Sequence, residues 1–369
     1  MHPWIAQRTQ YVDSSGIRKV FDLAAKMRNP INLSIGQPDF PVPDAVKEAA
    51  IAAIREDRNG YSLTQGMGCL RDKLQAEVDQ QLGHADRRVL VTSGTSGALV
   101  LAMLALVDPG DEVICLDPYF VMYPALSQMV GGKIVKVDSY PKFRIDIDKL
   151  RAAITPRTKL ILFNSPSNPT GVVATQAEAR AVAELAAERN IALLSDEIYR
   201  RFCYDAPLAS PAHWNDRTIV TDAFSKAYGI TGWRIGFMHG PAELIEKMTM
   251  LQQYTFVCAP HPLQYGAAAA MDVDMQEHID AYRVRRNRLV SGLRDLGYEV
   301  NDPGGAFYAF PKVPDGKGTA TEFVARCIER ELLVIPGGIF SGKDTHFRIS
   351  YAAPIKTIDR GLEVLGKLR

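Results

Sequence analysis

The hydrophobic pattern between residues 43 and 271 alternates between helical periods and short apolar runs. Helical periodicity is found at 44–56, 97–106, 176–189 and 241–253. The apolar runs predict strands at 89–91, 113–116, 134–137, 160–163, 192–194 and 219–221. Strands that alternate with helices form parallel sheets covered on both faces, so this part of the chain predicts an α/β domain with a mostly parallel sheet.

The pattern changes after residue 274 and predicts a smaller α+β domain. The expected elements are a long charged helix at 275–296, strands at 298–300 and 306–310, a helix at 319–331, two more short strands and a helix from about 355. The first 42 residues are irregular and become proline-rich, so we expect them to pack beside this part. The predicted division is a large domain, 43–274, and a small domain formed by 1–42 and 275–369.

The composition excludes several classes of function but does not identify one. The 369 residues are enough for two domains, and 43 basic against 42 acidic residues give a net charge of +1. This balance offers no basic patch for nucleic acid. The longest apolar run, 98–107, is about half the length that spans a bilayer, and the N-terminus has no apolar signal core, which predicts a cytoplasmic protein without membrane contact. Five scattered cysteines predict reduced thiols, with no disulfide framework and no metal site.

A polar loop follows the first predicted strand of the sheet. Thr92 to Gly97 is rich in Gly, Ser and Thr and leads into a helix. Such a loop offers free backbone N–H groups and the positive end of a helix dipole, which suits a phosphate group. Taken alone the signal is weak, because similar loops also serve as simple helix caps. The loop matches neither GxGxxG nor GxxxxGKS, which argues against dinucleotides and ATP.

Three more polar clusters follow predicted strands, at 164–171, 195–199 and 222–226. Read separately, Asn168 suits a turn, Asp196 a helix cap and Lys226 the surface. The carboxyl ends of parallel strands meet at one edge of the sheet, however, where ligands bind. A lysine there can form an imine with an aldehyde, and an acid can keep a pyridine nitrogen protonated. Together with an arginine and a helix N-terminus for a phosphate, the clusters indicate pyridoxal 5'-phosphate (PLP).

The same segments resemble those of the fold-type I, class I/II aminotransferases, in the aspartate-aminotransferase-like branch of bacteria and archaea. The matching motifs are Gly36 to Phe40, Ser167 to Gly171, Ser195 to Tyr199, Ser225-Lys226 with Thr231 to Arg234, and Phe347 to Tyr351. They occur in the family's order and spacing over nearly the whole chain. The resemblance implies a seven-stranded, mostly parallel sheet between helices, PLP as cofactor, and ping-pong transfer of an amino group from an L-amino acid to a 2-oxo acid. It also makes 2-oxoglutarate and glutamate the expected second pair.

The resemblance implies the catalytic roles. Lys226 corresponds to the lysine that forms the Schiff base with PLP and moves the proton between the substrate Cα and the cofactor. Asp196 corresponds to the partner of the pyridine nitrogen. Tyr199 and Asn168 correspond to the pair that bonds the 3' oxygen of the cofactor.

The remaining cofactor contacts follow in the same way. Arg234 corresponds to a phosphate ligand, with Gly94, Thr95 and Ser96 in the phosphate loop. Phe120 falls where an aromatic ring stacks on the cofactor, although core packing is the alternative. Many relatives carry a phosphate-binding serine at position 223, where this chain has alanine. Either one phosphate hydrogen bond is missing or Ser225 compensates for it.

The resemblance also implies substrate contacts and a partner subunit. Arg348 corresponds to the arginine that binds the substrate α-carboxylate, beside Gly36 and Asn168. Tyr61 corresponds to a tyrosine that reaches the phosphate of the neighbouring subunit, which implies a homodimer with shared active sites.

The substrate itself is left open by the sequence. Arg18 is a candidate for binding a distal carboxylate, or else a surface charge. Phe307, Tyr254 and Phe256 are candidates for an apolar substrate pocket, and helix packing is the expected role of the last two.

Two other functions use the same fold. A C–S lyase, racemase or decarboxylase would need the same lysine and the same electron sink. A PLP-binding sensor domain of a transcription regulator would need an N-terminal DNA-binding domain, and about 40 residues precede the large domain here.

Replacement of Lys226 by alanine tests the central expectation. The Lys226→Ala variant has no amine to form the Schiff base, so the visible absorbance that this linkage gives the cofactor should be lost. Turnover should fall by several orders of magnitude, because the same amine moves the proton. Absorbance spectra and steady-state rates measure both effects, and a variant with wild-type activity would contradict the assignment.

Overall fold

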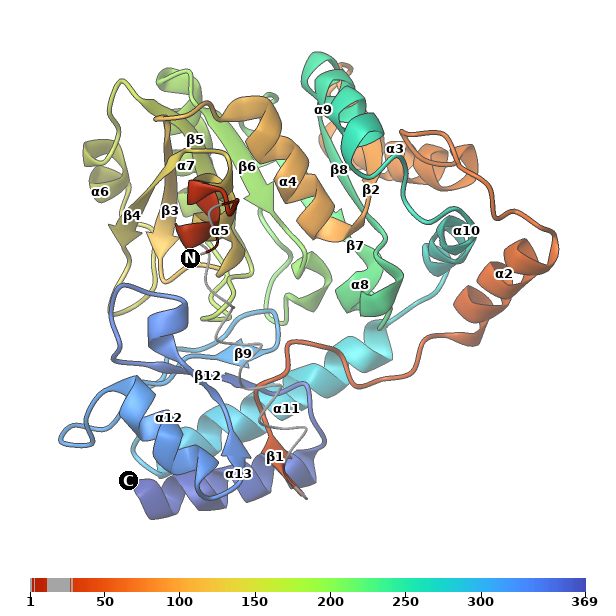
Figure 1. Ribbon diagram of the computed structural model, residues 1–369. Coiled ribbons are helices and arrows are strands. Elements are labelled where there is room, and N and C mark those ends of the chain that lie inside the picture. The colour runs from red at the N-terminus through yellow and green to blue at the C-terminus, as the bar shows by residue number, and fades with distance from the viewer. Residues whose placement is uncertain (1, 3, 12–26, 28) are drawn as a thin grey trace.

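The computed structural model describes residues 2, 4–11, 27 and 29–369, and it has two regions (Figure 1). The larger region is a seven-stranded sheet with helices on both faces, as expected from the sequence. Its strands are β2 (Arg87–Thr92), β3 (Glu112–Asp117), β4 (Lys133–Asp138), β5 (Thr158–Asn164), β6 (Ala192–Asp196), β7 (Ile219–Ala223) and β8 (Gly236–Pro241). They are ordered β2-β8-β7-β6-β5-β3-β4, and β8 alone among them runs antiparallel to its neighbours β2 and β7.

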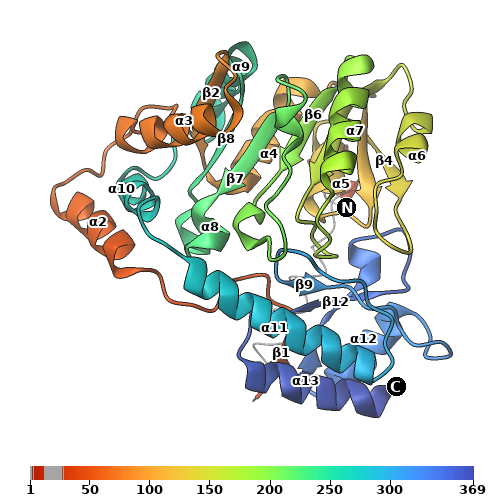
Figure 2. The same ribbon diagram turned by 180° about the vertical axis from the view of Figure 1, so that it is seen from behind.

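Helices cover both faces of this sheet. The region contains α2 (Asp44–Arg55), α3 (Gly68–Leu82), α4 (Gly94–Leu106), α5 (Met122–Met129), α6 (Ile147–Ala152), α7 (Gln176–Glu188), α8 (Phe224–Ala227), α9 (Ala242–Thr255) and α10 (His261–Ala270). Helices α4, α5 and α9 lie on the side of the sheet that faces the viewer in Figure 1. Helices α6 and α7 lie on the opposite side, which faces the viewer in Figure 2.

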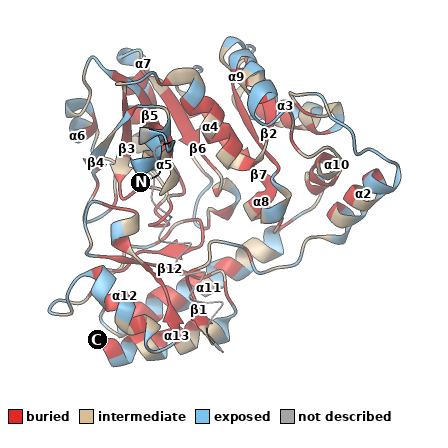
Figure 3. Cartoon of the chain, viewed as in Figure 1, coloured by how far each residue is buried: buried red, intermediate tan, exposed pale blue. Residues whose placement is uncertain are grey.

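Alternation along the strands explains the two layers. On β5, Leu160 and Leu162 pack into the core under α4, whereas Ile161 and Phe163 pack into the core under α7. Successive side chains of a strand point to opposite faces, so a strand buried on both faces needs a continuous apolar run. Figure 3 shows the result, with buried strands in the middle and exposed outer surfaces on the helices.

The smaller region combines short strands with three helices. Its elements are β1 (Ile31–Asn32), β9 (Tyr308–Ala309), β10 (Leu332–Leu333), β11 (Ile335–Pro336), β12 (Phe347–Ser350), α11 (Gln276–Asp295), α12 (Ala320–Ile328) and α13 (Ile355–Leu368). Strand β1 pairs in parallel with β10, and β11, β12 and β9 form an antiparallel sheet. An apolar cluster that includes Phe307, Phe323 and Phe347 joins all of these elements except β11.

Short 3-10 helices complete the described fold. They are η1 (Gln7–Tyr11), η2 (Arg200–Phe202), η3 (Pro211–His213), η4 (Thr231–Trp233) and η5 (Gly337–Ile339). Helix η1 contacts α5 of the larger region, while β1 pairs with β10 of the smaller region (Figure 1). The described parts of residues 1–42 therefore contact both regions. The division into 43–274 and 1–42 with 275–369 stays a prediction. Within the described residues, no helix is long and apolar enough to cross a membrane.

The structure corrects several expected elements. Residues 298–300 form no strand, because they pair with no strand of the described residues. Tyr298 is buried, and its hydroxyl donates to the Leu365 carbonyl oxygen at 2.9 Å. Strand β8 was not expected, since its sequence holds two glycines and ends in proline, residues that are depleted in strands. Helix α3 was also missed, although Leu70, Leu74 and Val78 recur at the helical spacing of four and are buried.

Candidate functional site

A cavity of about 290 Å³ lies at the carboxyl ends of the parallel strands. It is lined by these residues predicted for the site: Gly36, Thr95, Ser96, Phe120, Asn168, Asp196, Tyr199, Ser225, Lys226, Arg234 and Arg348. Its other lining residues are Ile35, Gln37, Leu99, Asn164, Ile198, Thr231 and Tyr308. Segments from all along the chain therefore meet where the topology of a parallel sheet places a ligand.

The other predicted residues lie elsewhere. Gly94 is outside the lining but adjacent to it, and Tyr61 lies outside the cavity with 85% of its surface exposed. Tyr308 lines the cavity in place of its neighbour Phe307. The expected helix packing of Tyr254 is wrong, since this residue is 86% exposed. Arg18 lies outside the described residues.

Lys226 lies in α8, directly after β7. Its Nζ donates a hydrogen bond to the Gly36 carbonyl oxygen at 2.6 Å. Desolvation lowers the pKa of the amine to about 8, and the positive charges of Arg348 and Arg234 act in the same direction. Relative to the ordinary value of 10.5, a pKa of about 8 raises the neutral fraction at pH 7 roughly 300-fold. The amine is thus prepared to act as a nucleophile and as a base.

Asp196 ends β6 and is buried. Tyr123, on α5, donates its hydroxyl proton to Asp196 Oδ2 at 2.7 Å, and the Ile198 N–H donates to Oδ1 at 3.3 Å. Burial raises the pKa of the carboxyl group to about 6, and these two hydrogen bonds oppose the rise. Because that pKa still lies below 7, the group is a carboxylate at neutral pH. A neighbouring cation would lower the pKa further.

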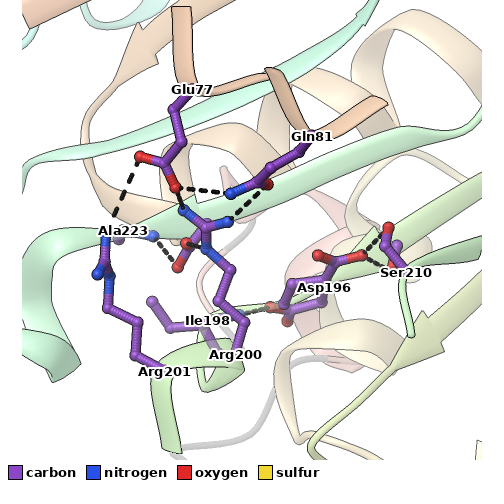
Figure 4. A network of polar contacts seen from close by, with 11 residues as sticks. Glu77, Gln81, Asp196, Ile198, Arg200, Arg201, Ser210 and Ala223 are labelled. Carbon is purple, nitrogen blue, oxygen red and sulfur yellow. Dashed lines mark hydrogen bonds and ion pairs between the residues drawn. The ribbon is translucent and has the colours of Figure 1, made fainter. Parts of the chain in front are cut away.

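An ion-pair network lies beside Asp196 (Figure 4). Arg200 Nε donates to Asp222 Oδ2 at 2.6 Å, and its guanidinium also contacts Glu77 of α3. The two carboxylates raise the pKa of Arg200, although burial opposes this. The charge of Asp222 by itself raises the pKa of Asp196, so its pairing with Arg200 limits that repulsion.

Arg348 is a buried cation without a carboxylate partner among the described residues. It is 2% exposed, and its Nη1 and Nη2 donate to Asn168 Oδ1 and to the Ser34 carbonyl oxygen, each at 2.9 Å. Its Nε has no hydrogen-bond partner in the part of the chain that the structure describes. Burying a charge with only neutral partners is costly, so this guanidinium is suited to an anion that enters the cavity.

The start of α4 forms a second anion cradle. Its N-cap residue, Ser93, makes no capping hydrogen bond with its side chain, and Thr95 Oγ1 is buried without a partner among the described residues. Arg234 Nη2 lies 3.5 Å from Ser96 Oγ and would lie 2.6 Å from a Cβ added at Gly94. Free helix N–H groups, an unpaired hydroxyl and a guanidinium are the donors that a phosphate needs. The site therefore fits the phosphate of PLP.

Tyrosines support the remaining wall of the cavity. Tyr199 Oη lies 2.9 Å from Tyr308 Oη, and the ring of Phe307 packs edge-on against that of Tyr199 at 5.3 Å. Tyr123 and Tyr308 were both missed by sequence reasoning. The single signal for Tyr308 was its place in the apolar run 306–310, which predicted a strand and no function.

The comparisons with known proteins agree with this geometry. Residues 28–365 match the model of the family "Aminotransferase class I and II". A probable aspartate aminotransferase of Methanocaldococcus jannaschii is 37% identical over 99% of both chains, and aromatic-amino-acid aminotransferase 2 of Thermococcus litoralis is 33% identical over 99% of this chain and 98% of its own. The structure of Thermus thermophilus aspartate aminotransferase with maleate superposes with a TM-score of 0.95, at 32% identity over 99% of both chains.

These matches span nearly the whole chain and agree with its seven-stranded fold. They also agree with a cavity that contains a reactive lysine and has groups suited to a phosphate and a carboxylate. The chain belongs to the class I and II aminotransferases, and it is a PLP-dependent enzyme that transfers amino groups.

Proposed function

We propose that the cavity binds PLP through Lys226 and transfers an amino group from an L-amino acid to a 2-oxo acid by a ping-pong mechanism, with 2-oxoglutarate and glutamate as one pair. The observation that carries this proposal is that Lys226 lines one cavity with Asp196 and two arginines, where burial and the two guanidinium groups lower the pKa of its amine. A lysine with this pKa is both nucleophilic and basic near neutral pH.

In this proposal the donors at the start of α4 hold the phosphate group. These are the backbone of Gly94 and the side chains of Thr95, Ser96 and Arg234. Ser225 lines the cavity near the buried Ala223 and takes over the contact that relatives assign to a serine at position 223.

The cofactor ring contacts other residues. Asp196 pairs with the pyridine nitrogen, Tyr199 and Asn168 bond the 3' oxygen, and Phe120 packs against the ring. When bound, PLP supplies an electron sink that stabilises negative charge at the substrate Cα. The buried carboxylate of Asp196 keeps that sink effective, because it holds the nitrogen protonated.

Substrate binding depends on Arg348 and Gly36. The guanidinium of Arg348 binds the α-carboxylate, and the Gly36 backbone lies against the same group. Once the substrate amine has displaced Lys226 from PLP, the freed Nζ would remove the proton from the substrate Cα and move it towards the cofactor. A neutral amine is needed for the first step, and desolvation beside two guanidinium groups provides it.

We also propose a cytoplasmic homodimer with shared sites. Gln252 of α9 donates to the Thr64 carbonyl oxygen at 2.6 Å, which holds the 61–64 segment beside the end of α9. Tyr61, Leu63 and Tyr254 on these segments are 85%, 57% and 86% exposed. Exposed apolar side chains in one area favour a partner surface, and Tyr61 would reach the partner's phosphate from it.

Lyases, racemases and decarboxylases with the same residues differ from an aminotransferase because they need no 2-oxo acid acceptor. Transamination consumes one 2-oxo acid for each amino donor, so product formation should stop after one turnover when no 2-oxo acid is present. Steady formation of product without an acceptor would contradict the proposal. The relatives reported above carry names of aminotransferases, which supports the same choice.

Loss of the Arg348 guanidinium should weaken the binding of every amino acid substrate to the same extent. We expect Arg348→Ala to raise KM about 100-fold across a panel of donors, because one partner of a buried charge pair is removed. The exposed Arg288, which pairs with Asp359 on the surface, gives the control variant Arg288→Ala. If KM rose for one substrate class alone, Arg348 would be binding a side chain and not the α-carboxylate.

Gly94→Ala should weaken binding of PLP at least about ten-fold, measured by titrating the apoenzyme with cofactor. The added Cβ displaces the Arg234 guanidinium, and the backbone φ of +66° is strained for alanine by about 1–2 kcal/mol. Gly83→Ala is the matched control, because Gly83 has φ +65° and nothing within 4 Å of its added Cβ. Equal affinity in both variants would argue against a role of Arg234 at the phosphate.

Mixed dimers test the shared site. We expect Tyr61→Ala to weaken PLP binding about ten-fold. In a dimer of one Tyr61→Ala and one Lys226→Ala subunit, the one site with a lysine receives an intact Tyr61 from the partner. Its activity should therefore saturate at the wild-type PLP concentration. If the mixed dimer instead needed the higher PLP concentration that saturates the Tyr61→Ala homodimer, Tyr61 would belong to the site of its own subunit.

A further inference from the structure

Tyr308 contacts three residues of the cavity without having an assigned role. It lies on β9, and its register partner on β12 is Ser350, two residues after Arg348. The Arg348 guanidinium carbon lies 4.5 Å from the centre of the Tyr308 ring, and the Tyr308 hydroxyl lies 2.9 Å from that of Tyr199. A Cβ at Gly36 would collide with the same hydroxyl. Tyr308 is 1% exposed, so burial restricts its movement although one side of it faces the cavity.

The direction of the hydroxyl contact follows from the number of protons available. On geometry alone either tyrosine could donate. Each hydroxyl has one proton, and Tyr199 must direct its own towards the cofactor if it bonds the 3' oxygen. Tyr308 Oη has no other hydrogen-bond acceptor among the described residues, so its proton is free for Tyr199.

We propose that Tyr308 is a positioning residue whose hydroxyl donates to Tyr199 and so directs the Tyr199 proton to the 3' oxygen of PLP, an inference that rests on the proposed function. Hydrogen bonds in a chain polarise one another, so the donor from Tyr308 makes Tyr199 a stronger donor. The Tyr308 ring, in contrast, packs against the Arg348 guanidinium. The hydroxyl thus acts on the cofactor and the ring on the substrate site.

Tyr308→Phe separates these two functions, since it removes the hydroxyl and keeps the ring. The test is a pH titration of the visible absorbance of the holoenzyme. Without the Tyr308 hydroxyl, Tyr199 donates a weaker hydrogen bond to the 3' oxygen of PLP, and the bound cofactor then holds its proton more tightly. We therefore expect the midpoint of the absorbance titration to move upward by about half a pH unit. KM for the amino donor should stay within about two-fold, because the contact with Arg348 remains. Tyr308→Leu should shift the midpoint and also raise KM.

Two controls distinguish this role from simple packing. Tyr298→Phe removes a hydroxyl from the same buried cluster, where it bonds the Leu365 carbonyl oxygen, and should leave the midpoint unchanged. In a Tyr199→Phe background, Tyr308→Phe should cause no further shift, because Tyr308 acts through the Tyr199 hydroxyl.

Two results would overturn the inference: an unchanged midpoint in Tyr308→Phe, or a shift of equal size in both backgrounds. A wild-type holoenzyme without visible cofactor absorbance would overturn the proposed function as well. The two failures can therefore be told apart.

Discussion

The cavity depends on the buried positive charge of Arg348, which has no carboxylate beside it in the part of the chain that the structure describes. The Arg348 guanidinium donates hydrogen bonds to two neutral acceptors, Asn168 Oδ1 and the Ser34 carbonyl oxygen. The ring centres of Tyr308 and Phe340 lie 4.5 and 4.7 Å from its central carbon. This arrangement leaves the charge available for an incoming anion. Desolvation lowers the pKa of Lys226, and the same charge acts in that direction together with Arg234. The charge of Arg348 thus serves both the binding of a carboxylate and the transfer of a proton.

The sheet brings these groups together because its strands end at one edge. Asp196 ends β6 and Lys226 follows β7, and these two strands are parallel neighbours. The acidic group of Asp222 beside them is compensated by Arg200, which also pairs with Glu77 of α3. Among the described residues, Asp196 has no salt-bridge partner and accepts hydrogen bonds from Tyr123 and from the Ile198 N–H. It therefore keeps a free charge for a cationic partner.

Much of this could be predicted from the sequence because the signals are local. Buried parallel strands require apolar runs, and the polar segments at 164–171 and 195–199 directly follow such runs. Tyr123 and Tyr308 could not be predicted, since their partners lie 73 and 109 residues away and no period or spacing relates them. The strand expected at 298–300 is absent for the opposite reason: its pattern is suitable, but it pairs with no strand of the described residues.

The reversed direction of β8 has a consequence for how the chain tolerates change. Because β8 runs against its neighbours, it begins at the cavity, and Gly236 pairs with Thr92 at the very place where Gly94 meets Arg234. The chain thus passes the cavity at Lys226 and returns to it eight residues later. One inserted residue between these points would shift the register of β8 and carry Arg234 away from the start of α4. Insertions in the surface loops that join α6 to β5 or α7 to β6 would leave both groups in place, so length variation should be least permitted between residues 226 and 236.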